Sequence, residues 1–248
     1  MKKLVVKLIF GFIILPASIA GTLYYLNRGG FFNIKKIEII VDNPVEGQEA
    51  FIKPLVAELE KNLSRYQGSS LWSIQLKSVS QSLASFDWIE DSSMKRSWPS
   101  SLTVRVKPYE VKLLYMQKVG GLVPIIKDGT FLEPVETKQA PDVAVLDGEV
   151  FKQRPELRKK AVELVEEMPL TGSFSKKTIS EVRYDNKDGF WMTMIKTGIQ
   201  VKIGDDQVAL KAARVSQVVD YLETHQFEAR VIDANLSKKV LVRLRKDP

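Results

Sequence analysis

The strongest pattern along the chain is an apolar run from Leu8 to Leu26 that contains no charged residue. A helix of that length rises about 28 Å, close to the roughly 30 Å thickness of a bilayer core. Lys2, Lys3 and Lys7 precede the run with no acidic residue among them, which favours a cytoplasmic N-terminus. We therefore predict a cytoplasmic tail over residues 1–7, a single transmembrane helix over residues 8–26, and the rest of the chain across the membrane.

A cleaved signal peptide is the alternative explanation for this run. Ser18-Ile19-Ala20 before Gly21 has the small-x-small pattern of a cleavage site. However, the apolar stretch continues past that site to Leu26, and it is longer than the usual apolar region of about 7–15 residues in a signal peptide. The pattern therefore favours a helix that is retained as an anchor.

Beyond the anchor, residues 32–108 alternate between strand and helix patterns. Ile37 to Val41 has the two-residue period of a strand, and apolar residues then recur at helical spacing from Ile52 to Leu63 and from Leu76 to Phe86. Strand patterns follow at residues 89–98 and 102–106. The order β-α-α-β-β predicts a small α+β domain in which two helices cover one face of a three-stranded sheet.

Residues 109–247 predict a larger β domain with helices packed on it. Lys127-Asp128-Gly129 should form a hairpin turn, because Asp-Gly supplies the positive φ of a tight turn. Helices are predicted over residues 154–168 and up to about Thr224, the second one capped by Asp205 or Asp206. Strands are predicted over residues 122–126, 130–132, 190–195, 199–203, 230–233 and 239–245.

Composition argues against several functional classes. Four of the 37 basic residues lie in residues 1–28, and the other 33 face 30 acidic ones, so the domains are nearly neutral and nucleic-acid binding is not expected. A local basic excess near the C-terminus fits either a solvated strand surface or a partner-binding one. There is no cysteine, which excludes disulfides and thiolate metal sites.

No constellation of residues indicates catalysis. His225 is the only histidine and falls near the end of the long predicted helix, where we expect a structural role. Gly29-Gly30 and Gly120-Gly121 lack the spacing of phosphate-binding loops. We predict no enzymatic activity, no cofactor, no metal and no small-molecule substrate. Core packing is expected for the large aromatic side chains Phe86, Trp88, Trp98 and Trp191.

The first domain carries motifs that resemble a known family. Trp88-Ile89 after the second helix, followed by Arg96, Trp98, Pro99 and Leu102, is similar to the POTRA-domain signature of the bitopic division proteins of the FtsQ/DivIB family. The resemblance covers essentially the whole chain and is looser in the second domain. Of the family's Asp-Leu-Arg-Tyr segment near the C-terminus only Asp233 is kept, since Ala234, Asn235 and Leu236 replace the others.

The resemblance implies a scaffold of the division machinery, in the inner membrane at the septum with the bulk of the chain in the periplasm. Its partners would be the small bitopic proteins FtsB and FtsL, other division proteins, and the lipid bilayer through one helix. FtsB would add a strand to the edge of the C-terminal sheet. An edge strand offers unpaired backbone groups to such a partner. The predicted partner-binding residues are Leu236, Ser237, Lys238, Lys239, Val240, Leu241, Val242, Arg243 and Leu244.

Two other functions compete with this one. A POTRA domain also fits an accessory protein of envelope assembly or protein export, because a fold does not fix a function. An exported hydrolase or nucleic-acid binder would require activity or salt-sensitive binding from the part of the chain after Phe31.

Overall fold

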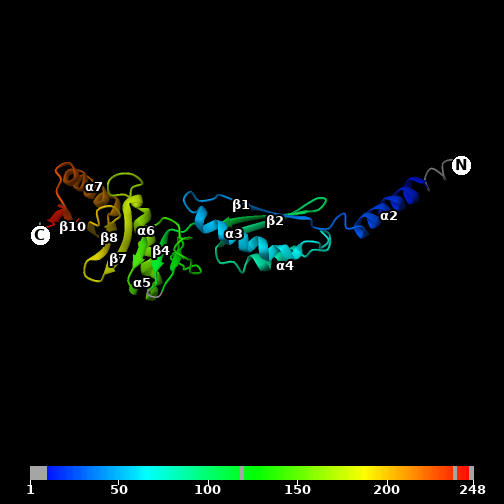
Figure 1. The fold of residues 1–248 in the computed structure, drawn as a ribbon, viewed down its shortest axis with the longest axis horizontal. Helices are drawn as coiled ribbons and strands as arrows, with labels where there is room; N and C mark the ends of the chain where they lie inside the picture. The colour runs from blue at the N-terminus through cyan, green and yellow to red at the C-terminus, as the bar shows by residue number, and fades with distance from the viewer. Residues whose placement is uncertain (1–9, 118–119, 237–238, 246–248) are drawn as a thin grey trace. The chain divides into compact units, whose positions relative to one another are not determined.

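A computed structural model describes residues 10–117, 120–236 and 239–245 (Figure 1). The chain divides into two compact units. The first holds the described residues up to Pro44 together with Ile52–Pro108. The second holds Val45–Phe51 and the described residues from Tyr109 onward. The fold is α+β, with a small three-stranded domain followed by a larger mixed sheet that carries helices.

An N-terminal helical segment opens the described chain. A π-helical stretch, η1, runs over Phe10–Ile14 and continues into α2, Leu15–Arg28. Leu26, the predicted far end of the membrane span, lies in α2, whereas Leu8 falls outside the described residues. Within the described ranges, no helix is both long and apolar enough to cross a membrane.

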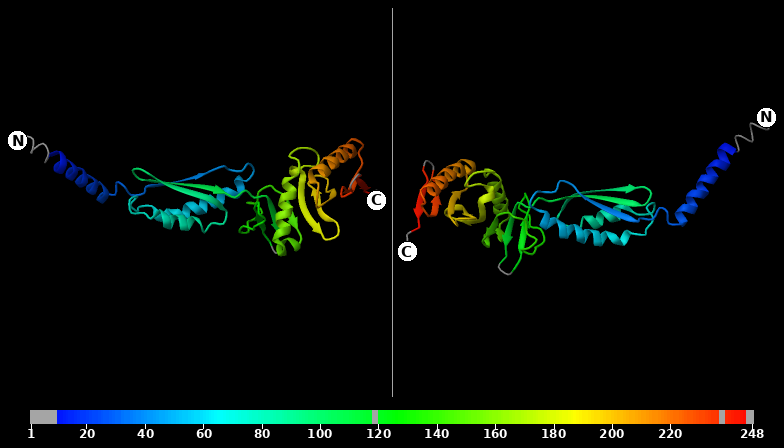
Figure 2. Two further views of the ribbon diagram at one scale, coloured as in Figure 1. Left: turned by 180° about the vertical axis from the view of Figure 1, so that it is seen from behind. Right: turned by 45° about the horizontal axis from the view of Figure 1, so that its top comes forward.

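The first domain confirms the β-α-α-β-β order. Its elements are β1 (Lys36–Val41), α3 (Glu49–Leu63), the 3-10 turn η2 (Ser64–Tyr66), α4 (Leu76–Leu83), β2 (Ile89–Ser97) and β3 (Ser101–Pro108). The sheet has the order β1-β3-β2, with β1 parallel and β2 antiparallel to the central strand. Both helices lie on one face of this sheet (Figure 2). Their contribution to the core comes from apolar residues that are completely buried, among them Leu59, Leu63, Val79 and Leu83.

The second domain is built on one mixed sheet of eight strands. Its order is β11-β10-β9-β8-β7-β6-β4-β5. The strands are β4 (Leu113–Met116), β5 (Leu122–Ile125), β6 (Val145–Asp147), β7 (Ile179–Asp185), β8 (Gly189–Met194), β9 (Gln200–Gly204), β10 (Ala229–Asp233) and β11 (Leu241–Leu244). The pairs β4–β6, β6–β7 and β9–β10 are parallel, and the other pairs are antiparallel.

Helices α5 (Val150–Gln153), α6 (Pro155–Glu166) and α7 (Val208–Thr224), with the 3-10 turn η3 (Lys176–Thr178), complete the second domain. The apolar faces of α6 and α7 join the inward residues of the sheet in one continuous core. Phe151, Phe174 and Phe190 are its largest fully buried side chains. This shared core fixes α7 against the end of the sheet that carries β10 and β11.

Several sequence-based expectations are wrong in detail. Asp205 and Asp206 do not cap α7, because Gln207 holds the N-cap position at φ +50° without a side-chain bond. Residues 130–132 form no strand and contribute only an isolated bridge between Phe131 and Ile125. Trp98 is not a core residue, because about half of it is exposed.

A short segment of the second unit, Val45–Phe51, follows β1 in sequence and includes the start of α3. Gln48 is buried, and its side-chain amide donates to the Val111 carbonyl at 2.8 Å and accepts from the Val111 N–H at 3.1 Å. One glutamine thereby satisfies both backbone groups of a residue 63 positions away. Because the bond depends on tertiary structure, periodicity in the sequence gives no signal for it.

Candidate partner-binding edge

The predicted binding strand lies at one end of the eight-stranded sheet. Among the described residues, β11 pairs only with β10, in an antiparallel register that places Leu241 opposite Asp233 and Arg243 opposite Val231. Its other side therefore carries backbone groups that no described strand covers. Leu236, Lys239 and Val240 precede the strand, while Ser237 and Lys238 lie outside the described residues.

The side chains of this segment separate into two sets. Val240 and Val242 are partly buried and pack on the domain core. Leu241 and Leu244 are 50% and 51% exposed, and Arg243 and Lys239 are exposed as well. One set holds the strand on the sheet, and the other is available for contacts with a second chain.

An open groove runs between β11 and α7. Its volume is about 420 Å³, and its surface is largely apolar. The lining residues are Gln217, Val218, Tyr221, Leu222, Phe227, Val242 and Leu244. Tyr221 and Phe227 remain 56% and 49% exposed. A chain that added a strand beside β11 would find apolar side-chain sites next to the backbone edge.

His225 closes the same end of α7. Its Nδ1 lies 2.8 Å from the Tyr221 carbonyl, and its ring stacks on Tyr221 with centroids 4.1 Å apart. The structural role expected for this histidine fits these contacts. Within the described residues, no cluster of histidine and carboxylate side chains could hold a metal ion.

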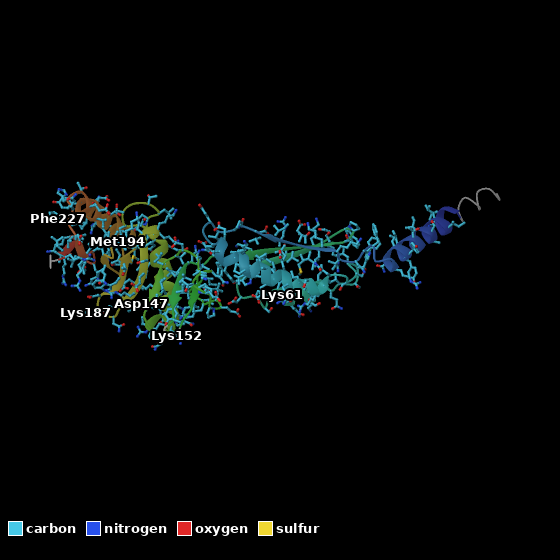
Figure 3. All side chains as sticks on the ribbon, in the orientation of Figure 1. Lys61, Asp147, Lys152, Lys187, Met194 and Phe227 are labelled. Carbon is cyan, nitrogen blue, oxygen red and sulfur yellow. The ribbon has the colours of Figure 1, made fainter. Side chains whose placement is uncertain are left out.

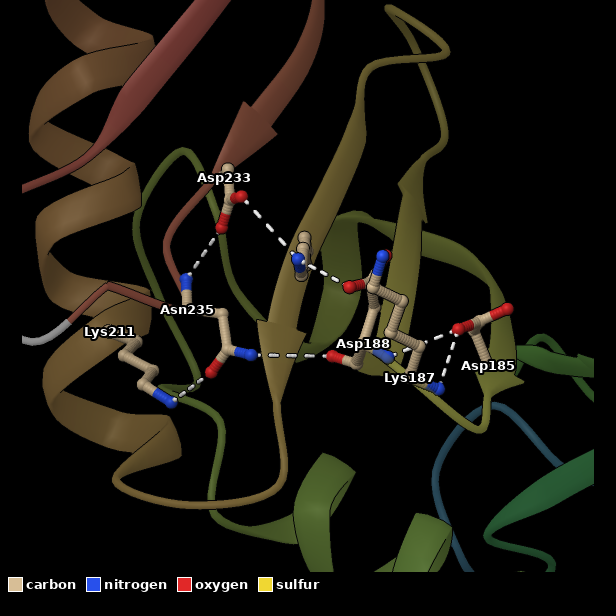
Figure 4. Close-up of polar contacts among 7 residues, drawn as sticks. Asp185, Lys187, Asp188, Lys211, Asp233 and Asn235 are labelled. Atoms are coloured by element: carbon tan, nitrogen blue, oxygen red, sulfur yellow. Dashed lines mark hydrogen bonds and ion pairs between the residues drawn. The ribbon is translucent and has the colours of Figure 1, made fainter.

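A polar network holds the chain that leads from β10 to β11 (Figure 4). Asn235 is its centre: the side-chain Nδ2 donates to the Asp188 carbonyl at 3.3 Å, and Oδ1 accepts from Lys211 Nζ at 3.1 Å. The backbone N–H of Asn235 donates to Asp233 at 3.0 Å. Asn235 thus has a structural role in this chain.

Two lysines extend this network. Lys202 Nζ lies 2.7 Å from Asp188 and 3.6 Å from Asp233, and the hydrogen bond to Asp188 is the main cause that raises the pKa of Lys202. Lys211 is buried and lies 2.6 Å from Asp206, whose pKa it lowers, chiefly through that hydrogen bond. Sequence patterns did not predict this network, because its residues come together only where β9, α7 and the end of β10 meet in the folded domain.

The motif residues of the first domain have separate roles. Trp88 and Leu102 are buried in its core. Arg96 donates to the carbonyls of Leu71 and Ile74 at 2.9 and 2.8 Å, which ties β2 to the loop between the helices. Trp98 and Pro99 form the exposed turn between β2 and β3, joined by a cis peptide bond.

Comparison with known protein families gives two matches. The family described as "POTRA domain, FtsQ-type" matches residues 55–109. The family described as "Cell division protein FtsQ/DivIB, C-terminal" matches residues 114–235. The two matches follow the order of the two domains, and the second ends at residue 235, before β11 begins at Leu241.

Three curated relatives, each named "Cell division protein FtsQ", are similar to the chain. The protein of Geobacter sp. (strain M21) is 26% identical over 71% of this chain and 66% of its own length. That of Syntrophotalea carbinolica is 20% identical over 94% and 81%, respectively. That of Cellvibrio japonicus is 23% identical over 87% and 65%. The chain thus spans just under two-thirds of the length of the first and third relatives.

Proposed function

Because the chain belongs to the FtsQ/DivIB family of non-enzymatic cell division proteins, we propose that it is a single-pass scaffold of the inner membrane. It recruits division proteins of the FtsB and FtsL type to the septum and links them. The charge-free run from Leu8 to Leu26 supplies the anchor, and the two domains lie in the periplasm.

The observation that carries the proposed partner site is the position of β11 at the end of the sheet. The partner adds a strand beside β11 and takes its affinity from backbone hydrogen bonds. Its side chains reach the exposed Leu241 and Leu244 and the groove against α7. Lys239 and Arg243 supply positive charge to acidic residues of the partner and thereby add specificity.

The division role is tested in cells of the source bacterium. A fluorescent fusion of the full chain should gather at constrictions, and depletion of the chain should produce filaments. An even distribution around the envelope, with normal division after depletion, would contradict the role at the septum and favour an envelope-assembly function.

The binding site is tested by a charge reversal, Lys239→Glu with Arg243→Glu, in the full chain. We expect co-purification of a tagged FtsB-type partner to fall at least about tenfold, because repulsion replaces attraction at the edge. The matched control is Lys152→Glu with Lys187→Glu, the same charge change at exposed positions away from Phe227 (Figure 3). Equal recovery of the partner by both variants would contradict the proposed contact of Lys239 and Arg243 with acidic residues of the partner.

A further inference from the structure

Four aromatic side chains form an exposed cluster at one end of the first domain. Phe32 is at its centre, with the rings of Phe31, Trp72 and Trp98 packed edge-on at centroid distances of 5.1, 6.0 and 5.8 Å. The two tryptophan rings lie 4.3 Å apart. Despite these contacts, Phe31, Trp72 and Trp98 remain 44%, 59% and 49% exposed. Among the described residues of this domain, no other large aromatic side chains cluster with so much exposed surface.

The backbone around the cluster is firmly joined, so its exposure belongs to an ordered structure. The Leu71 N–H donates to the Phe32 carbonyl at 2.9 Å, and the Lys35 N–H donates to the Ser100 carbonyl at 2.8 Å. Arg96 connects the third segment by its bonds to Leu71 and Ile74. The entry to β1, the loop between the helices and the β2–β3 turn therefore meet at this end.

The cluster also lies within a few residues of the end of α2. The Phe31 N–H donates to the Leu26 carbonyl at 3.0 Å, and the Gly29 N–H donates to the Tyr25 carbonyl at 2.9 Å. Phe31 follows Arg28 by three residues, and an extended chain spans at most about 3.6 Å per residue. Phe31 therefore lies within about 11 Å of Arg28. If residues 8–26 are the membrane anchor, Phe31 is held at the level of the lipid headgroups.

The chain segments that supply the cluster are basic. Residues 26–37, 61–86 and 92–109, which supply its three segments, contain no aspartate or glutamate. Of their ten basic residues, Lys36, Arg105 and Lys107 pair with Glu38, Asp42 and Glu90. Arg28, Lys35 and Lys95 each stand three residues along the chain from an aromatic residue of the cluster. Exposed tryptophan surrounded by cations is the chemistry of a protein surface that meets anionic lipid headgroups.

We propose that the cluster of Phe31, Phe32, Trp72 and Trp98 seats this end of the first domain in the interfacial layer of the membrane. This inference rests on the proposed anchor. Trp72 and Trp98 lie at the boundary between headgroups and acyl chains, and the surrounding lysines and arginines contact lipid phosphates. The contact gives the domain a second attachment to the bilayer and limits its tilt on the anchor.

The inference is tested with the full chain in nanodiscs of phosphatidylethanolamine and phosphatidylglycerol, with acyl chains brominated near the headgroup. Trp88→Phe with Trp191→Phe leaves Trp72 and Trp98 as the tryptophans, and Trp72→Phe with Trp98→Phe leaves the other two. Trp88 is buried and its Nε1 has no hydrogen-bond partner among the described residues, so its change to phenylalanine removes no hydrogen bond found there. We expect brominated lipid to quench the emission of the first variant and not of the second.

A cysteine label gives a second measurement that leaves Trp88 intact, because the chain has no cysteine of its own. A spin label at Trp72→Cys should lose accessibility to an aqueous relaxation agent when the chain enters nanodiscs. The matched control is Lys53→Cys. Lys53 is exposed and lies near the start of α3, about 15 Å along the helix from its C-terminal end. Its accessibility should not change.

Insertion is measured separately, as alkali-resistant co-sedimentation of the chain with liposomes. A chain that inserts, but whose Trp72 and Trp98 are neither quenched nor shielded, would overturn the interfacial contact and leave the anchor standing. The same result is expected if the cluster binds another protein and not the membrane. A chain that does not insert would overturn the anchor and this inference together.

Discussion

Lys211 is a buried cation whose single ammonium group connects three parts of the second domain. It donates to the Ile203 carbonyl at 3.0 Å, to Asn235 at 3.1 Å and to Asp206 at 2.6 Å. Asp206 is largely exposed, while the lysine is almost completely enclosed. The other two acceptors thus have most to lose if the lysine is removed.

We expect Lys211→Met to lower the free energy of unfolding by about 2–3 kcal/mol, because it removes a donor from the buried Ile203 carbonyl and from the partly buried Asn235 side chain. Asp206→Asn should cost much less, since Lys211 keeps its other two acceptors. Urea unfolding of the full chain in detergent, followed by near-ultraviolet circular dichroism, measures both. Equal losses for the two variants would show that the exposed ion pair carries the stability.

At the same scale, Trp98 shows why the sequence misled us. A tryptophan between a strand and a proline is as compatible with a core as with an exposed turn, because both positions accept a large ring. Trp88, ten residues earlier, is buried as expected. Only the arrangement of the hairpin decides which ring faces inward.

Among the elements, the turn at Lys127-Asp128-Gly129 is confirmed, and its glycine has a second reason to be there. Gly129 has φ +85°, and a Cβ at this position would lie 2.7 Å from the Lys159 backbone nitrogen. Gly198 has φ +65° with nothing within 4 Å of a Cβ. A side chain at residue 198 would therefore meet backbone strain alone, whereas one at residue 129 would also overlap with α6.

Gly198→Ala should destabilise the second domain by about 1 kcal/mol through backbone strain alone. Gly129→Ala should cost about 2 kcal/mol more, because α6 must also move away from the new methyl group. Thermal unfolding of both variants measures the difference. A similar loss in both would mean that the packing of the turn against α6 is loose.

Long elements with a regular spacing of apolar residues were predicted correctly more often than short ones. The two first-domain helices, α7 and the strands near residues 190–203 had clear repeats and formed where expected. β4 and β6 were missed, because strands of four and three residues leave too short a pattern. The position of β11 at the edge is implied by the family resemblance and is not derivable from its own alternation, since a central strand could show the same pattern.

At the scale of the whole molecule, the stability of the fold at low pH depends on carboxylates such as Glu166 that form ion pairs with lysine side chains. Lys112 lies 2.6 Å from Glu166 and 2.8 Å from Glu110, and it links the chain before β4 to the end of α6. The hydrogen bond from Lys112 lowers the pKa of Glu166. Burial lowers the pKa of Lys112, but the hydrogen bonds to both glutamates outweigh it and raise the value overall.

Because the pKa of Glu166 is lowered in the folded state, its ionised carboxylate stabilises the fold at pH values above the ordinary pKa of 4.5. This stabilisation is lost as the pH falls below that value and through the lowered pKa. We expect Glu166→Gln to reduce the dependence of stability on pH in that acid range. Urea midpoints measured across it, for the unmodified chain and the variant, test this. The matched control is Glu163→Gln, a more exposed position on the same helix. Parallel pH profiles for Glu166→Gln and the unmodified chain would contradict the role of this ion pair.

Among the described strands, β11 is both the edge of the sheet and the last in chain order. β10 pairs in parallel with β9, so the sheet is continuous up to β10 without β11, which pairs with β10 alone among the described strands. A chain interrupted before Leu241 retains seven strands of the sheet and lacks the eighth. If partners dock on β11, a product that ends before Leu241 lacks the strand on which they dock, so only copies that carry β11 can engage them.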